Sequence, residues 1–165
     1  LMLTFGCGLL PPKLIRMSPL VWNFHGGLTP RYRGVATLFW PTYMMEPQYT
    51  GTTLHHIDSS IDGGKVIHQT VPELRREEGV QQHSCRVTRT GIDDLLRIIG
   101  AISDGGVTPS AHGQSGASRT WLSADWRPEH LVPVYETNED LTAKRYLDGQ
   151  FESRAPRLIQ SDLIT

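Results

Sequence analysis

The sequence predicts an α/β fold, in which strand-length runs alternate with helical stretches. Two observations carry this prediction. Apolar or alternating runs of strand length, bounded by Gly, Pro or Asp, occur at residues 2–6, 20–24, 50–57 and 65–71. Residues 79–102 instead place their apolar side chains at helical spacing. With 165 residues, of which 38% are hydrophobic, the chain can bury one ordinary core, and we expect a single domain.

The first part of the chain predicts two strands joined by short helical segments. The first strand, 2–6, is followed by a short helix at 11–17 that starts at two prolines. The second strand, 20–24, leads into a glycine-rich loop. Residues 36–46 are expected to be helical, with Pro41 limiting or kinking the helix.

The middle of the chain predicts a hairpin and a long helix. Residues 50–57 and 65–71 form an expected antiparallel pair around a turn that contains two aspartates. The helix follows at 79–102, with Gly91 as a candidate interruption. Gly105 and its neighbouring glycine are expected to end it.

The last part of the chain has no motif with a chemical interpretation. Residues 108–118 are a predicted loop, and residues 127–136 and 139–147 are predicted short helices. We therefore divide the chain into residues 1–104, which carry the site, and a C-terminal extension, 105–165, packed on the same domain.

Composition excludes several classes of protein. The formal charge is −1, with Lys and Arg mixed among Asp and Glu, so there is no electrostatic footprint for nucleic acid and none is expected as a partner. The two cysteines are too few for a disulfide framework, and no apolar run reaches the length of a membrane span. A reducing, cytoplasmic location is the default, and the oligomeric state is left open.

Three kinds of polar group recur at strand ends. Asn23 and His25 lie two residues apart at the end of an apolar run, so their side chains point the same way on an extended strand. The turn after the third strand exposes the carboxylates of Asp58 and Asp62. An amide, an imidazole and a carboxylate together suit acyl-transfer chemistry.

The segments that carry these groups read NFHGGLTPRYRG and TGTTLHHIDSSIDGGKVIHQ. They resemble the formyltransferase family, whose members move a formyl group from 10-formyltetrahydrofolate to an amine. The likeness covers about residues 1–75. The matching positions, in order and at the family's spacing, are Asn23, His25, Leu28, Pro30, Tyr32, Arg33, Gly34, Thr50, Gly51, Thr53, His55, Asp62, Gly64 and Val66.

The resemblance implies roles for three catalytic residues. Asn23 and His25 would lie beside the formyl oxygen, and Asp62 would orient the histidine and take part in proton transfer. Asp62 is favoured over Asp58 because the family's glycine signature follows it at residues 64–66. Asp58 is expected to cap the turn.

The resemblance also implies binding residues for 10-formyltetrahydrofolate and for the acceptor. The residues expected to border the pterin are Phe5, Gly6, Leu9, Leu10, Pro11 and Ile61, for which ordinary packing is the alternative. Arg31, Arg33 and His55 are assigned to the acceptor side, where an arginine would bind a phosphate or a sugar hydroxyl. The alternative for Arg33 is a structural role, bonding loop carbonyls.

A metal site is the competing interpretation of the histidines. His25, His55, His56 and His68 occur near the two aspartates. Adjacent histidines in a strand point to opposite faces, so His55 and His56 cannot both bind one ion without distortion. We therefore expect no metal, and we assign both cysteines to packing.

The fold implied by the resemblance is the C-terminal half of a Rossmann-like formyltransferase domain with a small mixed helical and loop tail. Residues 2–6 resemble a strand already under way, so we expect the N-terminal half to be absent and the isolated chain to be inactive. The expected function is formyl transfer to a small-molecule primary amine, with an amino sugar favoured. The alternatives are a formyltetrahydrofolate hydrolase and a non-catalytic fragment that binds a ligand or partner.

Overall fold

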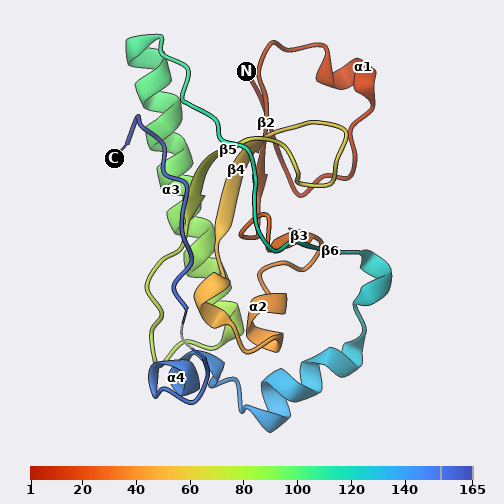
Figure 1. The fold of residues 1–165 in the computed structure, drawn as a ribbon, viewed down its shortest axis with the longest axis vertical. Helices are drawn as coiled ribbons and strands as arrows, with labels where there is room; N and C mark the ends of the chain where they lie inside the picture. The colour runs from red at the N-terminus through yellow and green to blue at the C-terminus, as the bar shows by residue number, and fades with distance from the viewer. Residues whose placement is uncertain (153, 165) are drawn as a thin grey trace.

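The chain folds around a four-stranded sheet with the strand order β1-β2-β4-β5 (Figure 1). A computed structural model describes residues 1–152 and 154–164. The strands are β1 (Met2–Phe5), β2 (Val21–His25), β4 (Thr52–His56) and β5 (Val66–Thr70). β1 lies parallel to β2, whereas β4 is antiparallel to both β2 and β5. The α/β class and the four predicted strands are confirmed.

One long helix, α3 (Val80–Gly105), runs along the sheet (Figure 1). The helix passes through Gly91 without interruption. Glycine fits this position because helix and sheet approach closely there: a Cβ on Gly91 would lie 2.2 Å from Oγ1 of Thr52. Gly106 ends the helix in the left-handed conformation, with φ of 65°. The buried core between helix and sheet consists of Trp22, Phe24, Leu54, Ile67, Leu95 and Ile98.

A second, two-stranded ribbon lies outside the main sheet. It pairs β3 (Tyr32–Gly34) with β6 (Arg119–Trp121) in parallel. Neither strand was predicted, because three residues carry too little pattern to separate a strand from a loop. The ribbon brings two segments far apart in sequence next to each other, and this places residues from the predicted extension beside β3.

The predicted helix at 36–46 is shorter than expected. Ala36 has a φ of 55°, outside the helical region, and the α-helix is confined to α2 (Trp40–Tyr43) with Pro41 in its first turn. The 3₁₀ turn η1 (Pro47–Tyr49) follows. The ring of Trp40 stacks on that of Trp121, with 4.1 Å between the centroids, and so joins α2 to the ribbon.

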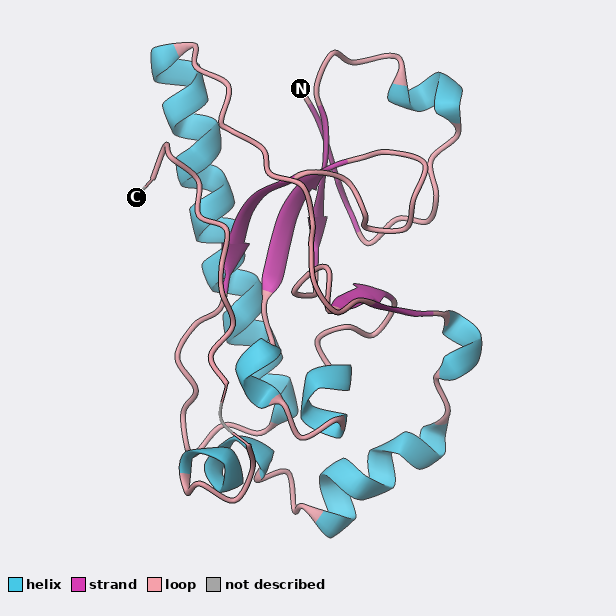
Figure 2. Cartoon of the chain, viewed as in Figure 1, coloured by secondary structure: helices cyan, strands magenta, loops and turns pink. Residues whose placement is uncertain are grey.

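The remaining helical segments are short. α1 (Pro12–Ile15) follows β1, and the chain after β6 curves through a series of helical turns below the sheet (Figure 2). These are η2 (Ser123–Asp125), η3 (Pro128–His130), the π-helical η4 (Pro133–Thr137) and α4 (Thr142–Leu147). The predicted helix at 127–136 is therefore helical but irregular. No helix in the described ranges is long and apolar enough to cross a membrane.

The end of the chain returns to the sheet along β5. The backbone N–H of Gln69 donates to the carbonyl of Ile159 at 2.8 Å, and the N–H of Ser161 donates to Nδ1 of His68 at 3.0 Å. Residues of the predicted extension thus hydrogen-bond to the sheet. The boundary between residues 104 and 105 stays a prediction.

Candidate active site

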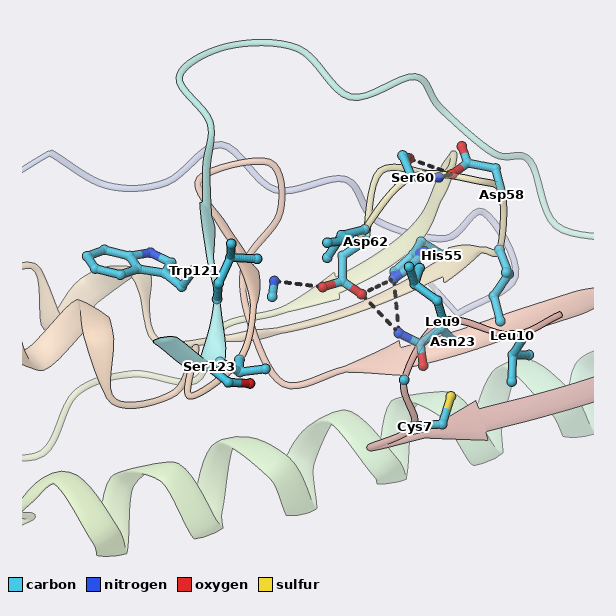
Figure 3. Close-up of a pocket in the computed structure, with 16 residues that line it drawn as sticks. Cys7, Leu9, Leu10, Asn23, His55, Asp58, Ser60, Asp62, Trp121 and Ser123 are labelled. Atoms are coloured by element: carbon cyan, nitrogen blue, oxygen red, sulfur yellow. Dashed lines mark hydrogen bonds and ion pairs between the residues drawn. The ribbon is translucent and has the colours of Figure 1, made fainter. Parts of the chain in front are cut away.

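Asp62 lies at the centre of a cluster of polar side chains in the turn between β4 and β5 (Figure 3). Its Oδ2 accepts the backbone N–H of Gly34 at 2.8 Å and lies 3.5 Å from Nδ1 of His25. Its Oδ1 accepts from Nδ2 of Asn23 at 3.3 Å and lies 3.6 Å from Nε2 of His55. The turn therefore places one carboxylate against groups from three strands.

Asn23 is held in one orientation by its neighbours on the sheet. Its Oδ1 lies 3.0 Å from the hydroxyl of Thr4, directly across the β1–β2 pairing, and the hydroxyl donates to it. Its amide nitrogen is therefore turned toward Asp62 and also lies 3.3 Å from Nε2 of His55. The amide N–H groups face the same space as the carboxylate.

Two backbone carbonyls fix the tautomers of the histidine rings. A carbonyl oxygen can only accept, so Nε2 of His25 donates to the carbonyl of Tyr32 at 3.0 Å, and Nδ1 of His55 donates to the carbonyl of His56 at 2.8 Å. In their neutral forms both rings then direct their unprotonated nitrogen toward Asp62. The three groups together are arranged to take up one proton.

Burial and charge set the protonation state of this cluster. Burial lowers the pKa of His25 below its ordinary value of 6.5, and the charge of Asp62 offsets this only in part. Burial alone would raise the pKa of Asp62, but the adjoining rings of His55 and His25 and the N–H of Gly34 bring it below 3.8. Burial therefore disfavours the charged form of His25, while the contacts of Asp62 favour its carboxylate form.

A cavity of about 220 Å³ opens onto three of these groups, Asn23, His55 and Asp62. His25 is set behind Asp62 and is buried. The other walls are largely apolar and come from the loop after β1, the turn after β4, β3 and the chain after β6. Its apolar lining residues include Leu9, Leu10, Val35, Ile57 and Ile61.

The structure brings half of the predicted pterin-side residues to this cavity. Leu9, Leu10 and Ile61 line it. Phe5 is instead 60% exposed and packs against Phe24, with 5.4 Å between the ring centroids. Gly6 turns the chain with a φ of 62°, and Pro11 precedes α1 as its N-cap.

The two predicted acceptor-side arginines hydrogen-bond to other side chains of the protein. Arg31 donates its Nε to Glu46 at 2.9 Å and lies over the ring of Tyr49, 4.6 Å from its centroid. Arg33 donates to Oε1 of Gln114 at 2.7 Å. Arg33 thus makes a contact within the protein, as its alternative structural role implies, but its partner is a side chain and not a loop carbonyl.

Gln114 is a supporting residue that sequence reasoning missed. Its Nε2 donates to the carbonyl of Asp62 at 2.9 Å and to that of Gly64 at 2.7 Å, while its Oε1 accepts from Arg33. The side chain therefore pins the turn that carries the carboxylate. It lies about fifty residues further along the chain, in a predicted loop, and nothing local in the sequence marks it.

The competing residues lie apart from the cluster. Asp58 caps its own turn, accepting the N–H of Ser60 at 2.8 Å, as Figure 3 shows. His56 meets the edge of Trp22, and His68 lies 3.3 Å from Asp94. Within residues 1–152 and 154–164, no group of three or more His, Cys, Asp or Glu side chains is arranged to hold a metal ion.

The fold and site define an α/β protein that surrounds one carboxylate with an amide and two imidazoles at the end of an apolar cavity. A family model described as "Formyl transferase" matches residues 1–99. The chain therefore belongs to the formyl transferase family, as the motifs predicted.

Curated relatives extend well beyond the region that this chain covers. The methionyl-tRNA formyltransferase of Anaeromyxobacter sp. (strain K) is 30% identical over 140 residues, which is 84% of this chain and 45% of that protein. That of Thermosynechococcus vestitus is 35% identical over 74 residues, 45% of this chain and 22% of that protein. The chain thus spans less than half the length of these relatives.

Solved structures show the same fold. A 4-N formyltransferase from Francisella tularensis superposes with a TM-score of 0.62 and 25% identity over 75% of this chain and 50% of that one. PseJ from Anoxybacillus kamchatkensis, solved with UDP-4,6-dideoxy-4-formamido-L-AltNAc and tetrahydrofolate, gives a TM-score of 0.70 at 19% identity, over 86% of this chain and 74% of that one. The predicted Rossmann-like formyltransferase fold is confirmed.

Proposed function

We propose that this chain takes part in transferring a formyl group from 10-formyltetrahydrofolate to a primary amine. The observation that carries the proposal is the cluster around Asp62, where an amide donor and an acceptor for one proton face the same cavity. Formyl transfer needs both, because charge develops on the formyl oxygen while the amine loses a proton.

The cavity suits the ring end of the donor. Leu9, Leu10 and Ile61 would hold a flat heterocycle by apolar contact, with Asn23 and Asp62 at its polar edge. Its volume of about 220 Å³ is below the range of about 300–1,000 Å³ usual for a whole ligand, so it matches part of the molecule. When bound there, 10-formyltetrahydrofolate supplies a formyl group attached through nitrogen.

The proposed roles of the side chains follow from their positions. The amine nitrogen forms a bond to the formyl carbon, and the bond from that carbon to the donor nitrogen breaks. Nδ2 of Asn23 stabilises the developing charge on the formyl oxygen. Asp62 takes the amine proton, shares it with Nδ1 of His25 at 3.5 Å, and returns it to the donor nitrogen. On the other side of the carboxylate, Nε2 of His55 lies 3.6 Å from Oδ1 of Asp62.

An amino sugar is the acceptor that we favour. The formal charge of −1 does not supply the basic surface of an RNA-binding protein, and PseJ, whose fold this chain shares, was solved with a nucleotide-linked formamido sugar. The methionyl-tRNA formyltransferase relatives favour an aminoacyl-tRNA instead. A cytoplasmic location also remains a proposal.

Occupancy of the cavity can be tested without turnover, because the chain carries its own probe and control. Cys7 lines the cavity, whereas Cys85 is exposed on α3. In the protein expressed from the complete reading frame, tetrahydrofolate should slow alkylation of Cys7 and leave that of Cys85 unchanged, as read by peptide mass spectrometry. Equal rates at Cys7 with and without tetrahydrofolate would contradict the donor site.

Turnover tests the chemistry. Loss of 10-formyltetrahydrofolate is followed with amino sugar nucleotides, with methionyl-tRNA and with water alone as acceptor. We expect Asp62→Asn to lose about 100-fold or more in rate and Asp58→Asn to stay near the parent. Equal losses at the two aspartates would contradict the assignment of the carboxylate. Turnover with water alone would identify a hydrolase. No turnover with any acceptor would favour the non-catalytic alternative, a protein that only binds a ligand or partner.

A further inference from the structure

A second cleft, of about 660 Å³, lies outside the candidate active site and shares no lining residue with it. Its walls come from three segments: residues 28–31 after β2, residues 115–117 before β6, and residues 154–157 near the end of the chain. Tyr49 completes it. Its volume is within the range of about 300–1,000 Å³ that is usual for a bound small molecule.

The charge of this cleft is one-sided. Arg31, Arg154 and Arg157 line it, and none of its described lining residues is Asp or Glu. The candidate active site has the opposite lining, with two aspartates and no Lys or Arg among its described walls. In a chain with a net charge of −1, three arginines around one hollow are a local concentration of positive charge.

The three arginines differ in what they already bind. Arg31 is paired with Glu46, which also accepts the hydroxyl of Tyr32 at 2.7 Å, and this pairing fixes its guanidinium beside Tyr49. Arg154 and Arg157 are exposed, and no hydrogen bond or ion pair joins either to another described residue. Among the described residues, the cleft therefore presents two guanidinium groups without a partner beside a fixed one.

We propose that this cleft binds a ligand of nucleotide size through its phosphate or diphosphate group. Guanidinium groups match the geometry of phosphate oxygens and form paired hydrogen bonds with them. The hydroxyl of Ser115 and the backbone of Gly116, which has open space around its α-carbon, line the same cleft and offer further contacts. The proposal rests on this cleft alone and not on the proposed formyl transfer.

An adjoining cleft does not suit the same ligand. It shares Arg31, Tyr49 and Arg154 with the 660 Å³ cleft, but its lining also includes Glu46 and Glu152. Two carboxylates would repel a phosphate there. The structure thus places the phosphate on the side of Arg157 and Ser115.

The test is a calorimetric titration of the protein from the complete reading frame with inorganic pyrophosphate. The double variant Arg154→Gln/Arg157→Gln should weaken binding by about tenfold or more. The matched control is Arg16→Gln/Arg89→Gln, which removes the same charge from two exposed arginines outside the cleft and should bind like the parent. Equal weakening in the two double variants, or no binding by the parent at millimolar pyrophosphate, would overturn the proposal.

Two further measurements separate this cleft from the candidate active site and assign the source of the phosphate. Pyrophosphate should leave the alkylation rate of Cys7 unchanged, and protection of Cys7 would place the anion in the other cavity and overturn the proposal. Uridine diphosphate and a four-nucleotide RNA are then used to displace pyrophosphate. Displacement by either supports the proposal and identifies a free nucleotide or an RNA end, and displacement by neither contradicts it.

Discussion

Gly34 donates its backbone N–H to Oδ2 of Asp62 at 2.8 Å. The glycine has a φ of 92°, and a Cβ at this position would lie 2.0 Å from the carbonyl oxygen of Trp121 on β6. Both backbone conformation and space therefore require glycine here. The β3–β6 pairing and the placement of the carboxylate depend on the same residue.

The variant Gly34→Ala is expected to lose both stability and turnover. Strain and the clash with Trp121 should cost about 1–3 kcal/mol in the free energy of unfolding, and displacement of the N–H should slow turnover by about tenfold or more. Urea denaturation and kcat measure the two effects. The control is Gly113→Ala, where nothing lies within 4 Å of the added Cβ. A Gly34→Ala protein that matches this control would show that the ribbon adjusts freely.

The variants Asn23→Ala and His25→Ala are each expected to lower kcat by about 100-fold or more. Removing one preorganised donor from an oxyanion site costs about 3 kcal/mol, and removing His25 leaves Asp62 without the ring nitrogen at 3.5 Å. Ser60→Ala is the control, because Ser60 lines the cavity but bonds only to Asp58 among the described residues. Near-normal kcat in both variants, with a good acceptor, would refute these roles.

Folding stability is expected to fall as the pH drops below about 6.5. Burial lowers the pKa of His25, His68 and His83 in the folded chain from the ordinary value of 6.5. Below that pH the unfolded chain binds protons that the folded chain does not, so the native state loses stability, whereas above it the full contribution is present. Urea midpoints at pH 8 and pH 5.5 measure the difference.

His68→Gln is the informative variant for this pH dependence. Nδ1 of His68 accepts the N–H of Ser161, and protonation of the ring would break that bond and release the end of the chain from β5. The variant should therefore show a weaker fall in stability between pH 8 and pH 5.5. Stability that is constant or rises over this interval in the parent would contradict the prediction.

The sequence predicted α3 well because this helix repeats its apolar positions over 26 residues. The four strands of the main sheet were recognised as short runs bounded by Gly, Pro or Asp. β3 and β6 are three residues each, and their pairing joins positions 32–34 to 119–121, which no local pattern reveals. The helical prediction at 36–46 was too long because a positive φ at Ala36 has no clear sequence signal.

The candidate site was predictable where its side chains lie at or just after strand ends. It was not predictable where a loop distant in sequence contacts the site. Asn23 and His25 share a face because they are two apart on β2, and both reach Asp62. Gln114 holds the turn of Asp62 from a loop that the sequence shows only as polar. The ion pair of Arg31 with Glu46 and its place in the second cleft had no signal in the sequence, and its assignment to the acceptor side stays a prediction.

The edge of the sheet at β1 leads to the last prediction, which concerns residues 1–165 expressed alone. β1 pairs with β2 on one side, and no described strand pairs with its other side. Leu3 and Phe5 on this strand are 40% and 60% exposed. An unpaired apolar edge is a template for association with another chain, so this protein should self-associate and show no turnover.

Light scattering across a concentration series measures the association. Leu3→Lys should reduce it, whereas Leu96→Lys, at an exposed leucine on α3, should not. A monomeric parent that transfers formyl groups would contradict the prediction, and equal effects of the two substitutions would show that general hydrophobicity, and not the strand edge, drives the association.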